Sequence, residues 1–136
     1  MPNRDVIDME IVKEIESSGN PKAFNKASGC RGLYQISEIC FKEFGQFHPA
    51  HNWTLDDLFN PAVNTFIARW YMLWRLPAMF KSWKIYPTTA VILAAYNWGP
   101  GNARGWCKKG GSIGDLPQET RAYINKYLRL EEEKNA

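Results

Sequence analysis

The stretch Ala90-Val91-Ile92-Leu93-Ala94-Ala95-Tyr96-Asn97 decides the fold of this 136-residue chain. Seven consecutive apolar residues follow two threonines that are suited to cap a helix, and Gly99-Pro100-Gly101 ends the run sharply. A surface helix shows polar residues at a period of 3.6, so an uninterrupted apolar helix belongs in the interior. The stretch therefore predicts a central helix that passes through a hydrophobic core.

The rest of the chain predicts further helices around this one. Ile7, Ile11 and Ile15 recur every four residues and indicate a helix over 5–17, which ends at a run of breakers. By the same patterns we expect a helix from Ser37 to about Phe44, a capped turn at Thr54–Asp57 and a helix from Pro61 until Pro77 kinks or ends it. A short helix is expected over 102–108 and a final helix after Leu116-Pro117. The segments 22–34 and 45–52 are expected to be loops.

Two helical faces are expected to supply the rest of the core. The first comprises Val63, Phe66, Ile67, Trp70, Leu73 and Trp74, and the second comprises Tyr123, Ile124, Tyr127 and Leu128. The fold class is therefore mainly α. No repeat or linker divides the chain, so we expect a single domain over residues 1–136.

Composition excludes several classes of protein. Apolar residues make up 45% of the chain and charged residues 23%, which indicates a folded globular protein. The net charge of +3 is scattered, so nucleic acid is not an expected partner. The longest apolar run is far too short to span a membrane. Cys30, Cys40 and Cys107 show no metal-ligand spacing, so zinc is not expected; a Cys30–Cys40 bridge is left open. We expect a monomer.

Glu16 stands at the edge of the apolar face of the first predicted helix, in its last turn. Acidic side chains are disfavoured near the negative end of a helix dipole, and partial burial also opposes ionisation. We therefore expect the pKa of Glu16 to be raised toward neutrality, which suits a general acid. A glutamate that ends a helix is most often a solvated surface residue, as we expect for Glu10 and Glu14, so Glu16 is singled out by the residues downstream.

Four blocks of residues follow one another in the chain. They are Glu16-Ser17 with Asn20-Pro21 and Ala23, Gly32-Leu33-Tyr34-Gln35-Ile36, Ala94-Ala95-Tyr96-Asn97-Trp98-Gly99-Pro100-Gly101, and Leu116-Pro117-Gln118-Glu119-Thr120-Arg121-Ala122-Tyr123-Ile124. In this order, over about residues 7–128, they resemble the family 1 lytic transglycosylase domain, the soluble lytic transglycosylase (SLT) type. Asn60-Pro61-Ala62-Val63-Asn64 also resembles the family's pattern before its third block, whereas Tyr34 replaces the usual Met.

The resemblance implies a lysozyme-like, goose-type helical domain with a small β-like excursion over residues 22–34. It implies cleavage of the β-1,4 bond between N-acetylmuramic acid and N-acetylglucosamine in peptidoglycan glycan strands. Glu16 would be the acid and then the base, and the muramoyl C6 hydroxyl would close on C1 to leave a 1,6-anhydromuramoyl end. No metal or organic cofactor enters this chemistry.

The resemblance also implies substrate-binding roles for residues of every block: Ser17, Tyr34, Gln35, Tyr96, Asn97 and Tyr123. Several have a structural alternative. The Ser17 hydroxyl is also suited to satisfy a helix-end carbonyl, and Tyr96 and Tyr123 are also suited to core packing. Trp98 and Trp106 bracket the Gly-Pro-Gly turn and are candidates for a groove wall, whereas Trp70 and Trp74 are expected in the core.

Two rival functions remain open. A hydrolytic muramidase of the goose-type lysozyme sort would activate water with a second carboxylate, for which Asp56, Asp57 or Glu43 are candidates. We expect Asp56, Asp57 and Glu119 to be helix-start residues instead. The other rival is a non-catalytic cell-wall binding module.

The expected place of action is the periplasm or cell wall. The first residues, Met1-Pro2-Asn3-Arg4-Asp5, lack the apolar core and cleavage site of a secretory signal. We therefore expect delivery by a phage, export by another system, or excision of this domain from a longer protein.

Overall fold

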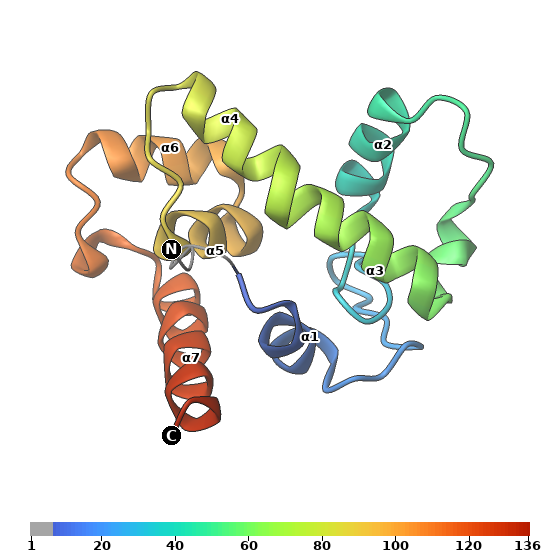
Figure 1. Ribbon diagram of the computed structural model, residues 1–136, viewed down its shortest axis with the longest axis horizontal. Helices are drawn as coiled ribbons and strands as arrows, with labels where there is room; N and C mark the ends of the chain where they lie inside the picture. The colour runs from blue at the N-terminus through green and yellow to red at the C-terminus, as the bar shows by residue number, and fades with distance from the viewer. Residues whose placement is uncertain (1–6) are drawn as a thin grey trace. The chain divides into compact units, whose positions relative to one another are not determined.

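The computed structural model describes residues 7–136, and these residues are mostly helical (Figure 1). The α-helices are α1 (Met9–Ser17), α2 (Glu38–Phe47), α3 (Pro61–Trp70), α4 (Leu76–Ser82), α5 (Thr89–Trp98), α6 (Pro100–Lys108) and α7 (Gln118–Lys134). Short 3-10 helices cover Leu55–Phe59 (η1) and Ile113–Asp115 (η3), and Tyr71–Arg75 (η2) is π-helical. The prediction of a mainly α fold is confirmed.

The chain divides into two compact units. The first unit contains residues 7–11 and 72–136, and the second contains Val12–Tyr71. Whether the whole chain behaves as the single domain that the sequence predicts stays a prediction. In the part of the chain described, no helix is both long and apolar enough to cross a membrane.

The first unit is built around α5, as the apolar stretch predicts. Its residues from Val91 to Ala95 are all buried, and α4, α6 and α7 pack against it (Figure 1). The hydroxyl oxygen of Thr88 accepts the Val91 amide and caps the helix. Gly99 ends α5 with a φ of +101°, a backbone conformation that glycine adopts without strain, and α6 begins at the next residue.

The second unit contains the part of α1 from Val12 onward, the irregular segment that follows it, α2, η1 and α3. The predicted β-like excursion is present as two isolated antiparallel bridges, Phe24 with Arg31 and Arg31 with Ile36. Ser37 caps α2 as predicted, and the Asn60 side chain accepts the amides of Ala62 and Val63 at the start of α3. Side-chain caps thus fix where both helices begin.

Some predicted helix boundaries need correction. Asp5 and Val6, predicted to open the first helix, lie outside the described residues, and α1 begins at Met9 because the Asp8 carboxylate accepts the amides of Glu10 and Ile11. The loop predicted from residue 45 begins three residues later, because α2 continues to Phe47.

Pro77 does not end its helix, which excludes one of the two predicted outcomes, and a kink at Pro77 stays a prediction. A proline lacks the amide that would bond to the carbonyl four residues earlier, and its ring crowds that carbonyl. Here the π-helical turn η2 precedes Pro77, which stands in the first turn of α4, where no amide is required. The chain therefore stays helical through to Ser82.

The predicted core face of the long helix is partly wrong. Phe66 and Trp74 are exposed, Trp74 by 53%, and Trp70 is half-buried. The buried face runs instead through Asn64, Ile67, Ala68, Met72, Leu76 and Phe80. On the last helix Leu128 is also exposed, although Tyr123, Ile124 and Tyr127 are buried as predicted.

Phe66 and Trp70 belong to an aromatic cluster around the buried ring of Phe44. The Phe44 ring centroid lies 4.0 Å from that of His48, 6.0 Å from that of Phe66 and 5.3 Å from that of Trp70. Aromatic rings favour such contacts, and they hold α2 against α3. His48 is therefore part of the packing of the second unit.

Candidate functional site

The predicted acid lies in the last turn of α1. Glu16 is half-buried, whereas Glu10 and Glu14 on the same helix are exposed, as expected for solvated residues. Ser18 and Gly19 take left-handed conformations, with φ of +54° and +77°, and end the helix directly after the acid. The end of α1 thus presents a carboxylate at the margin of an apolar face.

Ser17 makes the contacts that its structural alternative predicts. Its hydroxyl donates to the Lys13 carbonyl at 3.2 Å, and its oxygen accepts the Gly19 amide at 3.2 Å. Both bonds organise the end of the helix next to Glu16. A substrate-binding role for Ser17 stays a prediction.

The second block forms a tight turn. The amide of Gln35 donates to the Gly32 carbonyl at 3.1 Å, and Arg31 and Ile36 exchange two backbone hydrogen bonds at 3.0 Å on either side of it. Gln35 itself has a φ of +51°, which is uncommon for a residue with a side chain. This turn is joined to the first block, because the Ala23 carbonyl accepts the Gly32 amide at 2.8 Å.

The side chains of this turn have contacts that the sequence did not predict. Nε2 of Gln35 donates to the carbonyls of Ala23 and Gly32, at 3.2 and 3.1 Å, so its donor group supports the backbone of the turn. Tyr34, expected along the groove, has only 2% of its surface exposed. Both substrate-binding roles stay predictions, with little of Tyr34 available to a ligand.

Asn64 holds this turn in place. It is 0% exposed, its Oδ1 accepts the Tyr34 amide at 2.9 Å, and its Nδ2 donates to the carbonyls of Arg31 at 2.8 Å and Leu58 at 2.9 Å. A buried amide that is satisfied on both sides fixes its neighbours strongly. The sequence marked Asn64 only as part of the Asn-Pro segment.

Gly32 is required by this arrangement for two reasons. Its φ is +82°, and a Cβ added there would collide with Asn64 Nδ2 and the Leu58 carbonyl oxygen. The turn therefore packs its backbone directly onto the Asn64 amide, which no other residue type at position 32 would permit.

The third and fourth blocks meet inside the first unit. Asn97, in the last turn of α5, is half-buried, and its Oδ1 accepts the Thr120 hydroxyl at 2.8 Å. Thr120, on α7, is 2% exposed. Tyr96 is half-buried and Tyr123 is buried, so their side chains contribute to packing at this end of α5 and α7. The sequence did not single out Thr120.

The two tryptophans predicted for a groove wall differ. Trp98 is half-buried, but Trp106 is buried, and its Nε1 donates to the Ser112 carbonyl at 2.7 Å. Trp106 is therefore a core residue that closes the connector after α6, which corrects the prediction. Beside it on α6, the Arg104 guanidinium lies over the ring of Trp83, 4.6 Å from its centroid.

The candidates for a second carboxylate are mostly accounted for by helix structure. Asp57 Oδ2 accepts the Thr54 amide at 2.7 Å and completes the predicted capping box. Asp56 stands exposed in the same first turn, and Glu119 stands exposed in the first turn of α7. These three positions are helix-start residues, as expected. Glu43 lies half-buried within α2.

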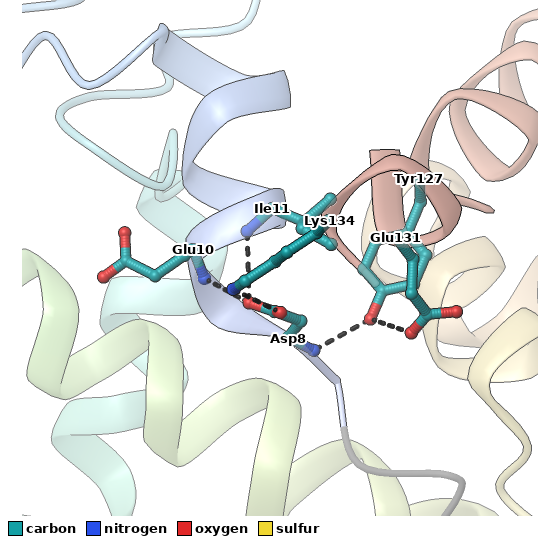
Figure 2. Close-up of polar contacts among 6 residues, drawn as sticks. All are labelled: Asp8, Glu10, Ile11, Tyr127, Glu131 and Lys134. Atoms are coloured by element: carbon teal, nitrogen blue, oxygen red, sulfur yellow. Dashed lines mark hydrogen bonds and ion pairs between the residues drawn. The ribbon is translucent and has the colours of Figure 1, made fainter. Parts of the chain in front are cut away.

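A charged network joins the beginning of α1 to the end of α7 within the first unit (Figure 2). Lys134 Nζ donates to Asp8 Oδ2 at 2.8 Å, and the Asp8 amide donates to the Tyr127 hydroxyl oxygen at 2.8 Å. Burial raises the pKa of Asp8, but hydrogen bonds from Lys134, Ile11 and Glu10 outweigh it and hold the pKa below its usual value. Burial, aided by the charge of Glu131, raises the pKa of Tyr127 to about 12.

The three cysteines are free thiols, so the Cys30–Cys40 bridge left open by the sequence is not formed. Burial raises the pKa of Cys40 far above its ordinary value, which keeps this thiol unreactive. Over residues 7–136, no group of three or more His, Cys, Asp and Glu side chains is arranged to hold a metal ion.

Comparisons with known proteins agree with the family resemblance, and the residues that the family model matches contain the first three blocks. A family model described as the transglycosylase SLT domain matches residues 8–116. The 70 kDa soluble lytic transglycosylase of Escherichia coli is similar in structure, with a TM-score of 0.73 and 24% identity over 91% of this chain and 21% of that chain. An inactive mutant of the lytic transglycosylase Slt of Pseudomonas aeruginosa has a TM-score of 0.73 and 24% identity over 87% of this chain and 19% of that chain.

The structural similarity confirms the predicted lysozyme-like fold. The chain spans only about a fifth of the length of these solved relatives. Among curated proteins, the sequence search found no match.

Proposed function

This chain belongs to the transglycosylase SLT domain family, and on that premise we propose that it is a peptidoglycan lytic transglycosylase that acts in the cell wall. Its substrate would be the β-1,4 bond between N-acetylmuramic acid and N-acetylglucosamine. The observation that carries the proposal is the half-buried Glu16 at the end of α1. Asp57, a candidate for a second catalytic carboxylate, instead caps a helix.

In the proposed reaction Glu16 acts twice. Its protonated carboxyl first gives a proton to the leaving glycosidic oxygen, and the bond from that oxygen to C1 breaks. The resulting carboxylate then takes the proton of the C6 hydroxyl of the same muramoyl sugar, and O6 bonds to C1. The products are a new 4-hydroxyl end and a 1,6-anhydromuramoyl end. The intramolecular attack benefits from proximity, so no second carboxylate is needed.

The remaining predicted residues would bind and orient the glycan. Asn97 is best suited to contact a sugar directly, because it is half-buried and only one side of its amide bonds to Thr120. Gln35 would act mainly by shaping the turn that follows Ala23, since its amide nitrogen supports that backbone. Ser17 and Tyr34 would support glycan binding within the second unit, and Tyr96 and Tyr123 would do so within the first.

The experiment that tests the acid compares two variants of the same helix. Glu16→Gln should lower the rate of peptidoglycan cleavage by at least about a hundredfold, because general acid–base catalysis contributes about that much or more. Glu14→Gln, on the exposed side of α1, is the matched control and should cleave at the wild-type rate. Equal activity of Glu16→Gln and Glu14→Gln would remove Glu16 from the mechanism and favour the non-catalytic binding module.

Product analysis separates transglycosylation from hydrolysis. Mass spectrometry of digested peptidoglycan should find muramoyl ends that are lighter by one water than the reducing ends of a hydrolase. Hydrated reducing ends would instead support the muramidase alternative, in which Glu43 is the remaining candidate for a base, since Asp56 and Asp57 are helix-start residues.

A further inference from the structure

The contact between Thr120 and Asn97 determines which side of the Asn97 amide a ligand meets. An asparagine amide carries an acceptor oxygen and a donor nitrogen that occupy nearly the same space, so either can face outward. Here Oδ1 accepts the Thr120 hydroxyl at 2.8 Å, which leaves Nδ2 on the other branch of the planar amide. Thr120 is 2% exposed, so water does not compete effectively for its hydroxyl.

The local fold holds Thr120 in place. It stands in the first turn of α7, on the same helix as the buried Ile124 and Tyr127, and α7 packs against α5, which carries Asn97. The contact therefore joins two helices of the first unit that already pack against each other. It is independent of the position of the second unit.

We propose that Thr120 is a positioning residue that makes Asn97 a donor for the acetamido carbonyl oxygen of an N-acetylated sugar. This inference rests on the proposed function, and it assigns to Asn97 the part of the substrate that distinguishes amino-sugar polymers from plain β-1,4 glucans. A fixed Nδ2 complements a carbonyl oxygen, whereas a sugar hydroxyl is satisfied by either side of the amide.

The test measures the preference between two neutral tetrasaccharides by NMR titration: the β-1,4 tetramer of N-acetylglucosamine and the β-1,4 tetramer of glucose. The wild-type protein should prefer the acetylated tetramer. Thr120→Val removes the hydroxyl at constant shape and should reduce this preference about three- to tenfold, as expected for one hydrogen bond. Thr120→Ser keeps the hydroxyl and should retain the preference.

The ratio of the two affinities is decisive, because a merely structural role would weaken both tetramers equally. An unchanged ratio in Thr120→Val, or a wild-type protein with no preference, would overturn the proposal. In an Asn97→Asp background, Thr120→Val should have no further effect on the ratio, since the donor that it orients is gone. Failure of the proposed function has a different signature, namely Glu16→Gln cleaving like Glu14→Gln.

Discussion

Asn64 contacts the predicted site residue Tyr34 and Asn97 is itself a predicted site residue, yet the two use their amides in opposite ways. Asn64 is fully buried and makes three hydrogen bonds to the backbone of its own unit. Asn97 is half-buried and makes one, to a side chain. A fully satisfied amide shapes the fold, whereas a partly satisfied one is available to a ligand. The difference lies in packing, which local sequence does not reveal.

The strongest test of this difference between the two amides is the same substitution at both positions. Asn64→Leu preserves approximate size but removes the hydrogen bonds that the Asn64 amide makes to the Tyr34 amide and the Leu58 carbonyl, whereas the Arg31 carbonyl keeps its bond from the Ile36 amide. Each of these two buried groups costs about 1–3 kcal/mol when it loses its hydrogen bond, so the free energy of unfolding should fall by at least about 2 kcal/mol. Asn97→Leu should cost only about 1 kcal/mol, because Thr120 alone loses its partner.

Urea denaturation of both variants measures these free energies. If Asn97→Leu proved as destabilising as Asn64→Leu, the division into a structural and an available amide would be wrong. Cleavage of peptidoglycan should follow the reverse pattern in the fraction that stays folded, with the greater loss in Asn97→Leu.

A second comparison tests how closely the turn packs onto Asn64. Gly32 and Gly19 have nearly the same φ, +82° and +77°, but a Cβ at Gly32 would meet Asn64 and Leu58 whereas one at Gly19 would meet nothing within 4 Å. Gly19→Ala should therefore cost about 1 kcal/mol, from the left-handed backbone alone. Gly32→Ala carries the same strain and a clash, and should cost about 1–3 kcal/mol more.

Thermal or urea unfolding measures the loss of stability in each alanine variant, and the difference between the two losses is the cost of the clash. Equal costs would mean that the backbone of the turn moves away from Asn64 without penalty. We do not expect a smaller residue at position 64 to restore the stability of Gly32→Ala, because that second change also removes the hydrogen bonds of the Asn64 amide.

Local patterns in the sequence predicted most helix starts but only part of the buried faces. Ser37, Asn60 and Thr88 cap the helices where their residue types indicate, because a cap depends only on the next three residues. Phe66 and Trp74 are exposed although their spacing suggested a core face. Which side of an apolar helix is covered depends on distant elements, such as Phe44 on α2 for Phe66.

The candidate site stays a prediction. Motifs in the sequence single out Glu16 and Asn97, and both side chains are half-buried in the structure. Asn64 and Thr120 orient neighbouring groups through contacts across 30 and 23 residues of sequence, and no local signal distinguishes them from other polar residues. The sequence did not show that the helix continues through Pro77, because the π-helical turn that precedes it has no simple sequence pattern.

The smallest expected effect concerns the network at the chain ends, whose bonds are ionic and partly exposed. Asp8→Asn keeps an oxygen to cap the amides of Glu10 and Ile11 but removes the ion pair with Lys134, which is 53% exposed. The loss should therefore be under about 1 kcal/mol near neutral pH, as for other solvent-exposed ion pairs. Urea denaturation of the wild-type protein and the variant gives the difference directly.

The pH dependence of that difference has a definite sign. The pKa of Asp8 is lower in the folded protein than its ordinary value, so the folded state releases this proton more readily than the unfolded state. The extra stability of the wild-type protein is present above the unfolded pKa of about 3.9 and is lost as pH falls through the lower folded value. A difference that grew on acidification, or that Lys134→Met left unchanged, would show that Asp8 acts only as a helix cap. Unlike the amide of Asn64, this contact should also weaken with added salt, because screening acts on exposed charges and leaves buried neutral hydrogen bonds intact.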